Sequence, residues 1–86
     1  MDINQLIAIV KKKIEKEIII ENIKIEDKSF LHKNHPGNSE NKFHLKISIE
    51  SKQLKKMSKI QSTKKIYQLL KEELKTFIHS IQIFLI

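Results

Sequence analysis

Residues 42–50, KFHLKISIE, contain the clearest structural signal in this chain of 86 residues. Apolar and polar side chains alternate along the segment, which is the period of a β-strand with one buried face. The core-facing set is Phe43, Leu45, Ile47 and Ile49, and the opposite set is Lys42, His44, Lys46, Ser48 and Glu50. The pattern predicts a strand that is polar on its outer face, and it makes His44 a surface residue.

A second strand and a loop precede this segment. Ile23 and Ile25 alternate with charged residues, so we predict a strand within residues 18–28. Residues 29–41 contain the chain's only proline and only glycine, side by side, which is typical of a loop centred on a turn. The strands before and after this loop are expected to form an antiparallel hairpin.

Helices are predicted before and after the hairpin. Residues 2–17 place apolar side chains on one helical face, and Asp2 with Gln5 makes a capping-box pair at its start. Residues 52–75 lack glycine and proline and contain a second stripe, and either Ser58 with Gln61, or Ser62, could cap its start. The first stripe consists of Ile3, Leu6, Ile7, Val10 and Ile14, and the second of Ile66, Leu70, Leu74 and Phe77.

The third strand is predicted at residues 77–86, so the element order is helix–strand–strand–helix–strand. A helix that connects the second and third strands makes a crossover, which predicts parallel strands and a right-handed connection. The helices then cover the apolar face of a three-stranded sheet. We therefore predict a single domain, residues 1–86, with a two-layer α+β fold.

Composition narrows the classes of function. The chain has no cysteine, which removes disulfides, thiol catalysis and thiolate metal sites, and agrees with a reducing, cytoplasmic location. No apolar run reaches the ~20 residues of a membrane span, and the order of charges near Met1 is the reverse of a secretory signal. Glu72 and Glu73 are expected on an exposed helix, where neighbours face different directions, so they are not a catalytic pair. One glycine cannot make a phosphate-binding loop, and no nucleophile–base pair can be inferred, so we do not expect an enzyme.

Positive charge is concentrated in the second half of the chain. Residues 1–51 hold nine lysines and eight acidic residues, whereas residues 52–86 hold eight lysines and two acidic residues. Such a surface suits nucleic acid, an anionic membrane or an acidic partner, but it is also what a solvated helix face looks like. All 17 basic residues are lysine, so the bidentate arginine contacts that read phosphate and guanine are missing.

Three histidines are candidate metal ligands. If the second and third strands are parallel neighbours, His79 lies at the same end of the sheet as the loop that carries His32 and His35. His79 has the parity of Ile81 and Ile83, so a structural histidine at the core margin competes with a ligand there. The spacing of His32 and His35 allows chelation, but two loop histidines are also typical of an exposed loop.

Three segments of the chain resemble the BolA family: EDKSFLHKNHPGNSENKFHLKISIES, KKIYQLLKEEL and FIHSIQI. The resemblance covers about residues 22–85, and the element order agrees with the one predicted above. It rests on the combination of motifs rather than on any single one. The matching positions are Asp27, Ser29, His32, Pro36, Gly37, Ser39, Glu40, Phe43, Glu72, Glu73, Leu74, Ile78, His79, Ser80 and Ile81.

The resemblance implies a class II KH-like fold and a partner, a monothiol glutaredoxin with a CGFS active site. In that family the two proteins can bridge a [2Fe-2S] cluster, to which the glutaredoxin and glutathione supply thiolates. Carried over to this chain, the imidazole ligand is His79, and a second ligand would be His32 or His35. The implied role is assembly or trafficking of iron–sulfur clusters, by a chain that is otherwise a monomer or a weak homodimer.

The family is also associated with transcriptional regulation and stress response, which implies nucleic-acid binding as the alternative function. The lysines available for it here are Lys55, Lys56, Lys59, Lys64 and Lys65. This sequence departs from the family pattern near them, with Leu54-Lys55-Lys56 for a Phe-x-Gly turn and Ser62-Thr63-Lys64 for an Arg-His-Arg-like helix start. The loop between His32 and Phe43 also looks one residue longer than usual. The first two departures weaken the DNA-binding alternative, and the third leaves His32 and His35 as competitors.

Overall fold

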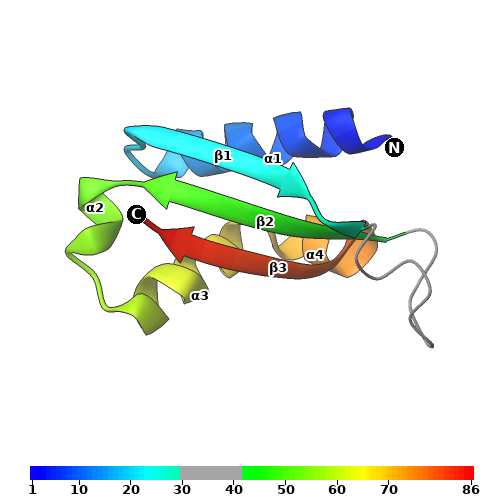
Figure 1. The fold of residues 1–86 in the computed structure, drawn as a ribbon. Helices are drawn as coiled ribbons and strands as arrows, with labels where there is room; N and C mark the ends of the chain where they lie inside the picture. The colour runs from blue at the N-terminus through cyan, green and yellow to red at the C-terminus, as the bar shows by residue number, and fades with distance from the viewer. Residues whose placement is uncertain (30–41) are drawn as a thin grey trace.

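The computed structural model describes residues 1–29 and 42–86, which form one layer of helices on one face of a sheet (Figure 1). The elements follow the predicted order, helix–strand–strand–helix–strand, with the second helical region divided into three. Their bounds are α1 (Ile3–Glu17), β1 (Asn22–Asp27), β2 (Phe43–Glu50), α2 (Lys52–Lys55), α3 (Lys59–Leu69), α4 (Lys71–Thr76) and β3 (Ile78–Leu85).

The sheet has the order β1-β2-β3, so β2 is its central strand. β1 pairs with β2 in the antiparallel sense, with Ile23 opposite Ile49 and Ile25 opposite Ile47. β2 pairs with β3 in the parallel sense. The predicted hairpin pairing, the parallel crossover and the two-layer α+β arrangement are all confirmed.

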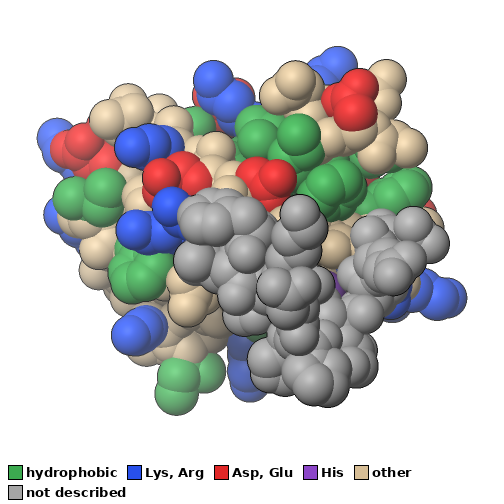
Figure 2. Space-filling view, turned by 45° about the vertical axis from the view of Figure 1, so that its right-hand side comes forward, with side chains coloured by type: hydrophobic (Ala, Val, Ile, Leu, Met, Phe, Trp, Pro, Cys, Tyr) green, Lys and Arg blue, Asp and Glu red, His purple; other side chains and the backbone are tan. Residues whose placement is uncertain are grey.

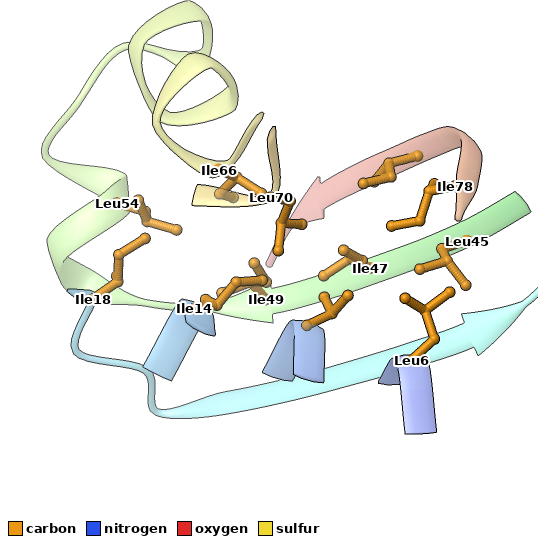
Figure 3. Close-up of a cluster of buried hydrophobic side chains, with 12 residues drawn as sticks. Leu6, Ile14, Ile18, Leu45, Ile47, Ile49, Leu54, Ile66, Leu70 and Ile78 are labelled. Carbon is orange, nitrogen blue, oxygen red and sulfur yellow. The ribbon is translucent and has the colours of Figure 1, made fainter. Parts of the chain in front are cut away.

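The core lies between the sheet and the helices (Figure 3). As the alternation predicted, Leu45, Ile47 and Ile49 of β2 are buried, and they share one cluster with side chains from α1, α2, α3 and β3. The twelve buried apolar residues are Leu6, Val10, Ile14, Ile18, Leu45, Ile47, Ile49, Leu54, Ile66, Leu70, Ile78 and Ile81. Each such side chain contributes about 1.5–3 kcal/mol by leaving water, so this cluster is the main source of stability.

Side-chain caps fix where the two longer helices begin. The Asp2 side chain accepts a 2.8 Å hydrogen bond from the Gln5 N–H, and the Gln5 side chain accepts one of 3.1 Å from the Asp2 N–H. Ser58 forms the same reciprocal pair with Gln61 at the start of α3. Both capping predictions are confirmed, and each pair satisfies two N–H groups that would otherwise lack partners.

The second helical region is less regular than the sequence predicted. Leu70 separates α3 from α4 with φ −104° and ψ 17°, outside helical geometry, while its side chain is fully buried in the core. The Leu74 N–H nevertheless donates to the Leu70 carbonyl at 2.8 Å, so the chain continues in a helical course beyond the break.

Glu73 of α4 is buried, contrary to the expectation of an exposed helix face. It keeps 7 % of its surface exposed, and its Oε2 lies 2.7 Å from Nζ of Lys13 in α1. Its other oxygen, Oε1, is buried and has no hydrogen-bond partner within the described residues. The pair joins the first helix to the last one, because a buried carboxylate needs a neutralising partner.

Replacement of Lys13 by Met should therefore destabilise the domain. We expect the free energy of unfolding to fall by about 1–3 kcal/mol, because the Glu73 carboxylate would stay buried without a counterion. Urea unfolding of Lys13→Met, Glu73→Gln and the double variant measures this, and the double variant should lose less than the sum of the two. Lys12→Met, an exposed change on the same helix, is the control. Equal loss in Lys12→Met and Lys13→Met would contradict the assignment.

No helix among the described residues is both long enough and apolar enough to cross a bilayer.

Candidate functional site

One extra residue at the start of β3 decides where His79 lies. Phe43 is paired with Ile78 but His44 is paired with Ser80, so the register shifts by one residue between these pairs, as in a β-bulge. His79 has no partner on β2 and stands exposed between the two paired positions. Bulges of this kind redirect a side chain and are common beside functional sites.

The shift overturns the predicted parity of His79. Ile78 and Ile81 are both buried, although strict alternation allows only one of them on the core face. The bulge accommodates both and turns His79 and Ser80 outward. The expectation that His79 shares the core face of Ile81 and Ile83 is therefore wrong, and this residue is not a buried structural histidine.

His44 is the second imidazole at this place, and its predicted surface position is wrong. It keeps only 5 % of its surface exposed. Its ring centroid lies 4.9 Å from that of His79, with an interplanar angle of 53°. Its Nδ1 lies 2.7 Å from Oγ of Ser80, the residue after His79. The two histidines, one from β2 and one from β3, thus form a contacting pair.

Hydrogen bonds from the two residues that follow β1 fix the backbone position of His44. The Ser29 hydroxyl accepts a 3.1 Å hydrogen bond from the His44 N–H, and the Lys28 N–H donates to the His44 carbonyl at 2.7 Å. Ser29 is itself held, because its N–H donates to Oδ1 of Asp27 at 2.9 Å. The Phe43 N–H donates to the carbonyl of residue 77, which anchors the start of β3. These hydrogen bonds hold the backbone on which the imidazole pair is placed.

His32 and His35 fall outside the described residues, so their place relative to His79 stays a prediction. Within residues 1–29 and 42–86, no group of three or more His, Cys, Asp or Glu side chains gathers as a metal site. The described part of the site is thus a pair of imidazoles. Sequence reasoning missed His44 because its contact with His79 depends on strand register, which alternation within one strand does not reveal.

Glu26 lies at the centre of a charge cluster on the outer face of the sheet. Its carboxylate oxygens lie 3.8 Å from Nζ of Lys24, 3.4 Å from Nζ of Lys28 and 4.0 Å from Nζ of Lys46. Partial burial raises the pKa of Glu26, but attraction to these ammonium groups outweighs it and lowers the pKa below its ordinary value. Lys46 also lies 5.1 Å above the ring of Phe84. Mixed charges of this kind are visible across the face shown in Figure 2.

The lysines named as a nucleic-acid surface lie on and around α2 and α3. Lys55, Lys56, Lys59 and Lys64 are exposed, and Lys65 is half-buried. In the described part of the chain none of the five forms an ion pair, so their charges are not neutralised by a nearby carboxylate. They remain a candidate surface for anions.

The described residues thus form a small α+β domain that has a three-stranded mixed sheet and an imidazole pair at one end. Comparison with known proteins gives the family: a family model described as BolA-like protein matches residues 14–86. The chain therefore belongs to the BolA-like family, as the resemblance predicted.

Two curated relatives support this assignment. A DNA-binding transcriptional regulator BolA from Haemophilus influenzae is 38% identical over 77 residues, which cover 90% of this chain and 72% of the relative. Protein BOLA1, chloroplastic, from Arabidopsis thaliana is 31% identical over 77 residues, which cover 86% of this chain and 48% of the relative. The chain thus matches about half the length of the plant protein. Neither relative is named as an enzyme.

Solved structures show the same fold. BolA1 from Arabidopsis thaliana aligns with a TM-score of 0.76 at 30% identity, over 91% of this chain and 86% of the other. The BolA domain of SufE1 from the same plant aligns with a TM-score of 0.73 at 29% identity, over 88% and 84% of the two chains.

The pKa of Glu26 provides a test of the outer-face charge cluster. Because its folded-state pKa is lowered, the carboxylate stabilises the fold above the unfolded-state pKa, and this stabilisation is lost as the pH falls through the folded value. We expect Lys24→Gln to raise the pKa of Glu26 toward its ordinary value, measured by NMR titration of the side-chain carboxyl. Lys75→Gln, on a helix, is the control. An unchanged Glu26 titration in Lys24→Gln would contradict the cluster.

Proposed function

We propose that this chain acts in iron–sulfur cluster assembly or trafficking, as a partner of a monothiol CGFS glutaredoxin. In this role it supplies the His79 imidazole to a [2Fe-2S] cluster shared with the glutaredoxin and glutathione. The observation that supports this most directly is the exposure of His79 at a bulge at the start of β3, where a cluster held by another molecule can reach it.

The donor chemistry of the chain fits such a shared cluster. Because the chain contains no cysteine, it cannot hold a cluster on thiolates by itself, and imidazole nitrogen is the donor that it can supply to an iron. The partner thiolates would come from the glutaredoxin and from glutathione. When bound, a cluster with mixed imidazole and thiolate ligands has a higher reduction potential than one held by thiolates alone.

His79 would bind such a cluster without rearrangement of the core. Its side chain lies outside the hydrophobic cluster, while the neighbouring Ile78 is 1 % exposed and anchors the strand. The role needs no catalytic group, so we propose a non-enzymatic function. We also propose a cytoplasmic location, because a reducing compartment preserves the thiolates on which the partner depends.

Replacement of His79 tests this function. We expect a mixture of the chain with a cluster-loaded monothiol glutaredoxin and glutathione to give a heterodimer with a visible-range circular dichroism spectrum. His79→Ala should change that spectrum and shorten the lifetime of the cluster at least about tenfold, because one metal ligand is lost. Gln82→Ala, an exposed change on the same strand, is the control.

Spectra and cluster lifetimes that are the same in His79→Ala and in the wild-type chain would contradict the ligand assignment. Amide spectra of both variants verify that the fold is intact, so that loss of the cluster reports on ligation.

Nucleic-acid binding is the second candidate function. The exposed lysines of α2 and α3 lack ion-pair partners in the described part of the chain, and the Haemophilus influenzae relative is named as a DNA-binding transcriptional regulator. Since no arginine is present, such binding would rest on contacts between lysine and phosphate rather than on reading of base edges.

The salt dependence of DNA binding tests this second function. We expect fluorescence anisotropy with a short duplex to show binding that weakens steeply with salt. The double variant Lys55→Gln/Lys59→Gln should reduce the slope of log K against log salt by roughly 2, because each phosphate contact adds about 0.9. Lys11→Gln/Lys12→Gln on α1 makes the same change in net charge elsewhere. Absence of salt-dependent binding, or equal effects of the two pairs, would eliminate this function.

A further inference from the structure

A groove lies between the C-terminal end of β3 and the turn that joins α2 to α3 (Figure 1). Met57, Ile83 and Leu85 contribute apolar side chains to its lining, and each of the three is only partly buried. The volume of the groove, about 370 Å³, falls within the ~300–1,000 Å³ of typical ligand-binding pockets. The groove is therefore large enough to receive an apolar side chain of another molecule.

The charged side chains of the groove are all basic. Lys55 and Lys59 line it, both are exposed, and neither forms an ion pair within the described residues. Residues 51–71 and 77–86, which include the whole lining of the groove, contain no Asp or Glu. An occupant with carboxylate groups would therefore be attracted. A second copy of this chain would be repelled, because each copy carries a net charge of +7.

The groove borders an edge of the sheet, because β3 has β2 on one side and no strand on the other among the described residues. The Ile86 N–H donates to the Ile49 carbonyl at 2.8 Å. Backbone groups of successive residues point to opposite sides of a strand, so Ile83 and Leu85 direct theirs away from β2. Within residues 1–29 and 42–86 these groups have no hydrogen-bond partner. Such an edge can accept a further strand.

Tyr67 marks where the free part of this edge begins. Its hydroxyl donates to the Ile81 carbonyl at 3.3 Å, and Ile81 has the same parity as Ile83 and Leu85. The contact agrees with the outward direction of these backbone groups and occupies the edge on the side of His79. An added strand would thus pair at residues 83–85, beside the groove. Six residues of strand, about 20 Å, separate this place from His79.

We propose that the groove and the free edge of β3 bind an extended acidic peptide segment of a partner protein. The segment adds a strand to the sheet at residues 83–85, and its backbone hydrogen bonds supply affinity. One apolar side chain of the segment enters the groove between Met57 and Ile83. Carboxylates before and after it pair with Lys55 and Lys59, whose flexible side chains can reach either way along the peptide. This site is independent of the proposed cluster ligand.

Single-stranded nucleic acid is the main competing occupant, because the same lysines are candidates for phosphate contacts. Two observations favour the peptide. Nucleic-acid grooves stack successive bases on several aromatic rings, whereas the lining here has one, Phe84, and is otherwise apolar or basic apart from Thr63. The free N–H and C=O groups of residues 83–85 also have the spacing of another peptide backbone, which nucleic acid does not offer.

Binding of model peptides to the whole chain tests the proposal. The probe is a fluorescein-labelled hexapeptide, Glu-Leu-Glu-Leu-Glu-Glu, whose two leucines fall on one face of a strand. The control peptide, Glu-Glu-Leu-Leu-Glu-Glu, has the same composition and charge but places the leucines on opposite faces. We expect fluorescence anisotropy to show at least about tenfold tighter binding of the first peptide, because its side-chain spacing fits strand addition. Equal affinities, or no binding of either peptide up to millimolar concentration, would overturn the proposal.

Backbone measurements test the strand pairing without any substitution in the chain. Saturation with the first peptide should slow hydrogen exchange of the Ile83 and Leu85 amides at least about tenfold, while the amides of β1, at the opposite edge, stay unchanged. Methylation of the backbone nitrogens of the peptide's leucines, or of its glutamates, removes the donors on one side of the added strand. One methylated peptide should bind at least about tenfold more weakly and the other like the parent, because only one side pairs with β3. Equal behaviour of the two would contradict strand addition.

Matched variants test the location of the site. Thr63→Glu places a carboxylate in the lining of the groove and should weaken binding of the first peptide at least about tenfold. Gln68→Glu makes the same change in charge at an exposed position of the same helix and serves as the control. Lys55→Gln/Lys59→Gln should weaken binding and make it less sensitive to salt, because two attractive charges are lost. Equal effects of Thr63→Glu and Gln68→Glu would show that the peptide binds elsewhere.

Three further measurements separate the peptide from other occupants and from the cluster function. His79→Ala should bind the first peptide within about twofold of the wild-type chain, because distant sites act independently. This result stands whether or not His79 proves to be a cluster ligand. A short oligodeoxythymidine that displaces the peptide and protects the same two amides would make the groove a nucleic-acid site and overturn the proposal. Light scattering that shows a dimer dissociated by the peptide would assign the edge to a second copy and overturn it as well.

Discussion

Burial of one face of β2 is the constraint on which the rest of the structure depends. Leu45, Ile47 and Ile49 are at most 2 % exposed, and among the described residues β2 is the only strand with a neighbour on both sides. The helices must cover this face, because its apolar side chains stabilise the domain only when a second layer shields them from water. The positions of α1 and α3, and the crossover that makes β3 parallel to β2, all follow from that requirement.

Because of the bulge in β3, the exposed imidazole of His79 can lie directly beside this core. Burial of both Ile78 and Ile81 adds apolar contacts at the end of the sheet, but their spacing of three residues does not fit a strand of period two. One extra residue in β3, His79, allows both isoleucines to face the core, and its own side chain lies on the surface. A side chain next to the core is thus available to another molecule without exposing the core itself.

Sequence patterns correctly predicted the structural features that depend on a single segment of the chain or on the order of the segments. The alternation in β2, the caps at Asp2 and Ser58, and the order of the elements are local or follow from connectivity, and the structure confirms them. His79 was predicted on the core face and His44 on the surface. Both predictions are wrong, because the positions of these side chains depend on the register between strands. Glu73 was also predicted wrongly, since its burial depends on Lys13, sixty positions away. The family, in turn, came from the combination of motifs and not from periodicity.

The hydrogen bonds of the buried polar side chains favour one strand register over the others. A buried polar side chain without its partner costs free energy, so each hydrogen bond favours the arrangement that contains its partner. The His44–Ser80 contact exists only with the shifted register, and a slip of β3 by one residue would turn side chains to the opposite face. The same contact that holds β3 in register therefore keeps His79 exposed beside His44. The burial of one face of β2 thus determines the fold, and the His44–Ser80 contact favours the strand register that exposes His79.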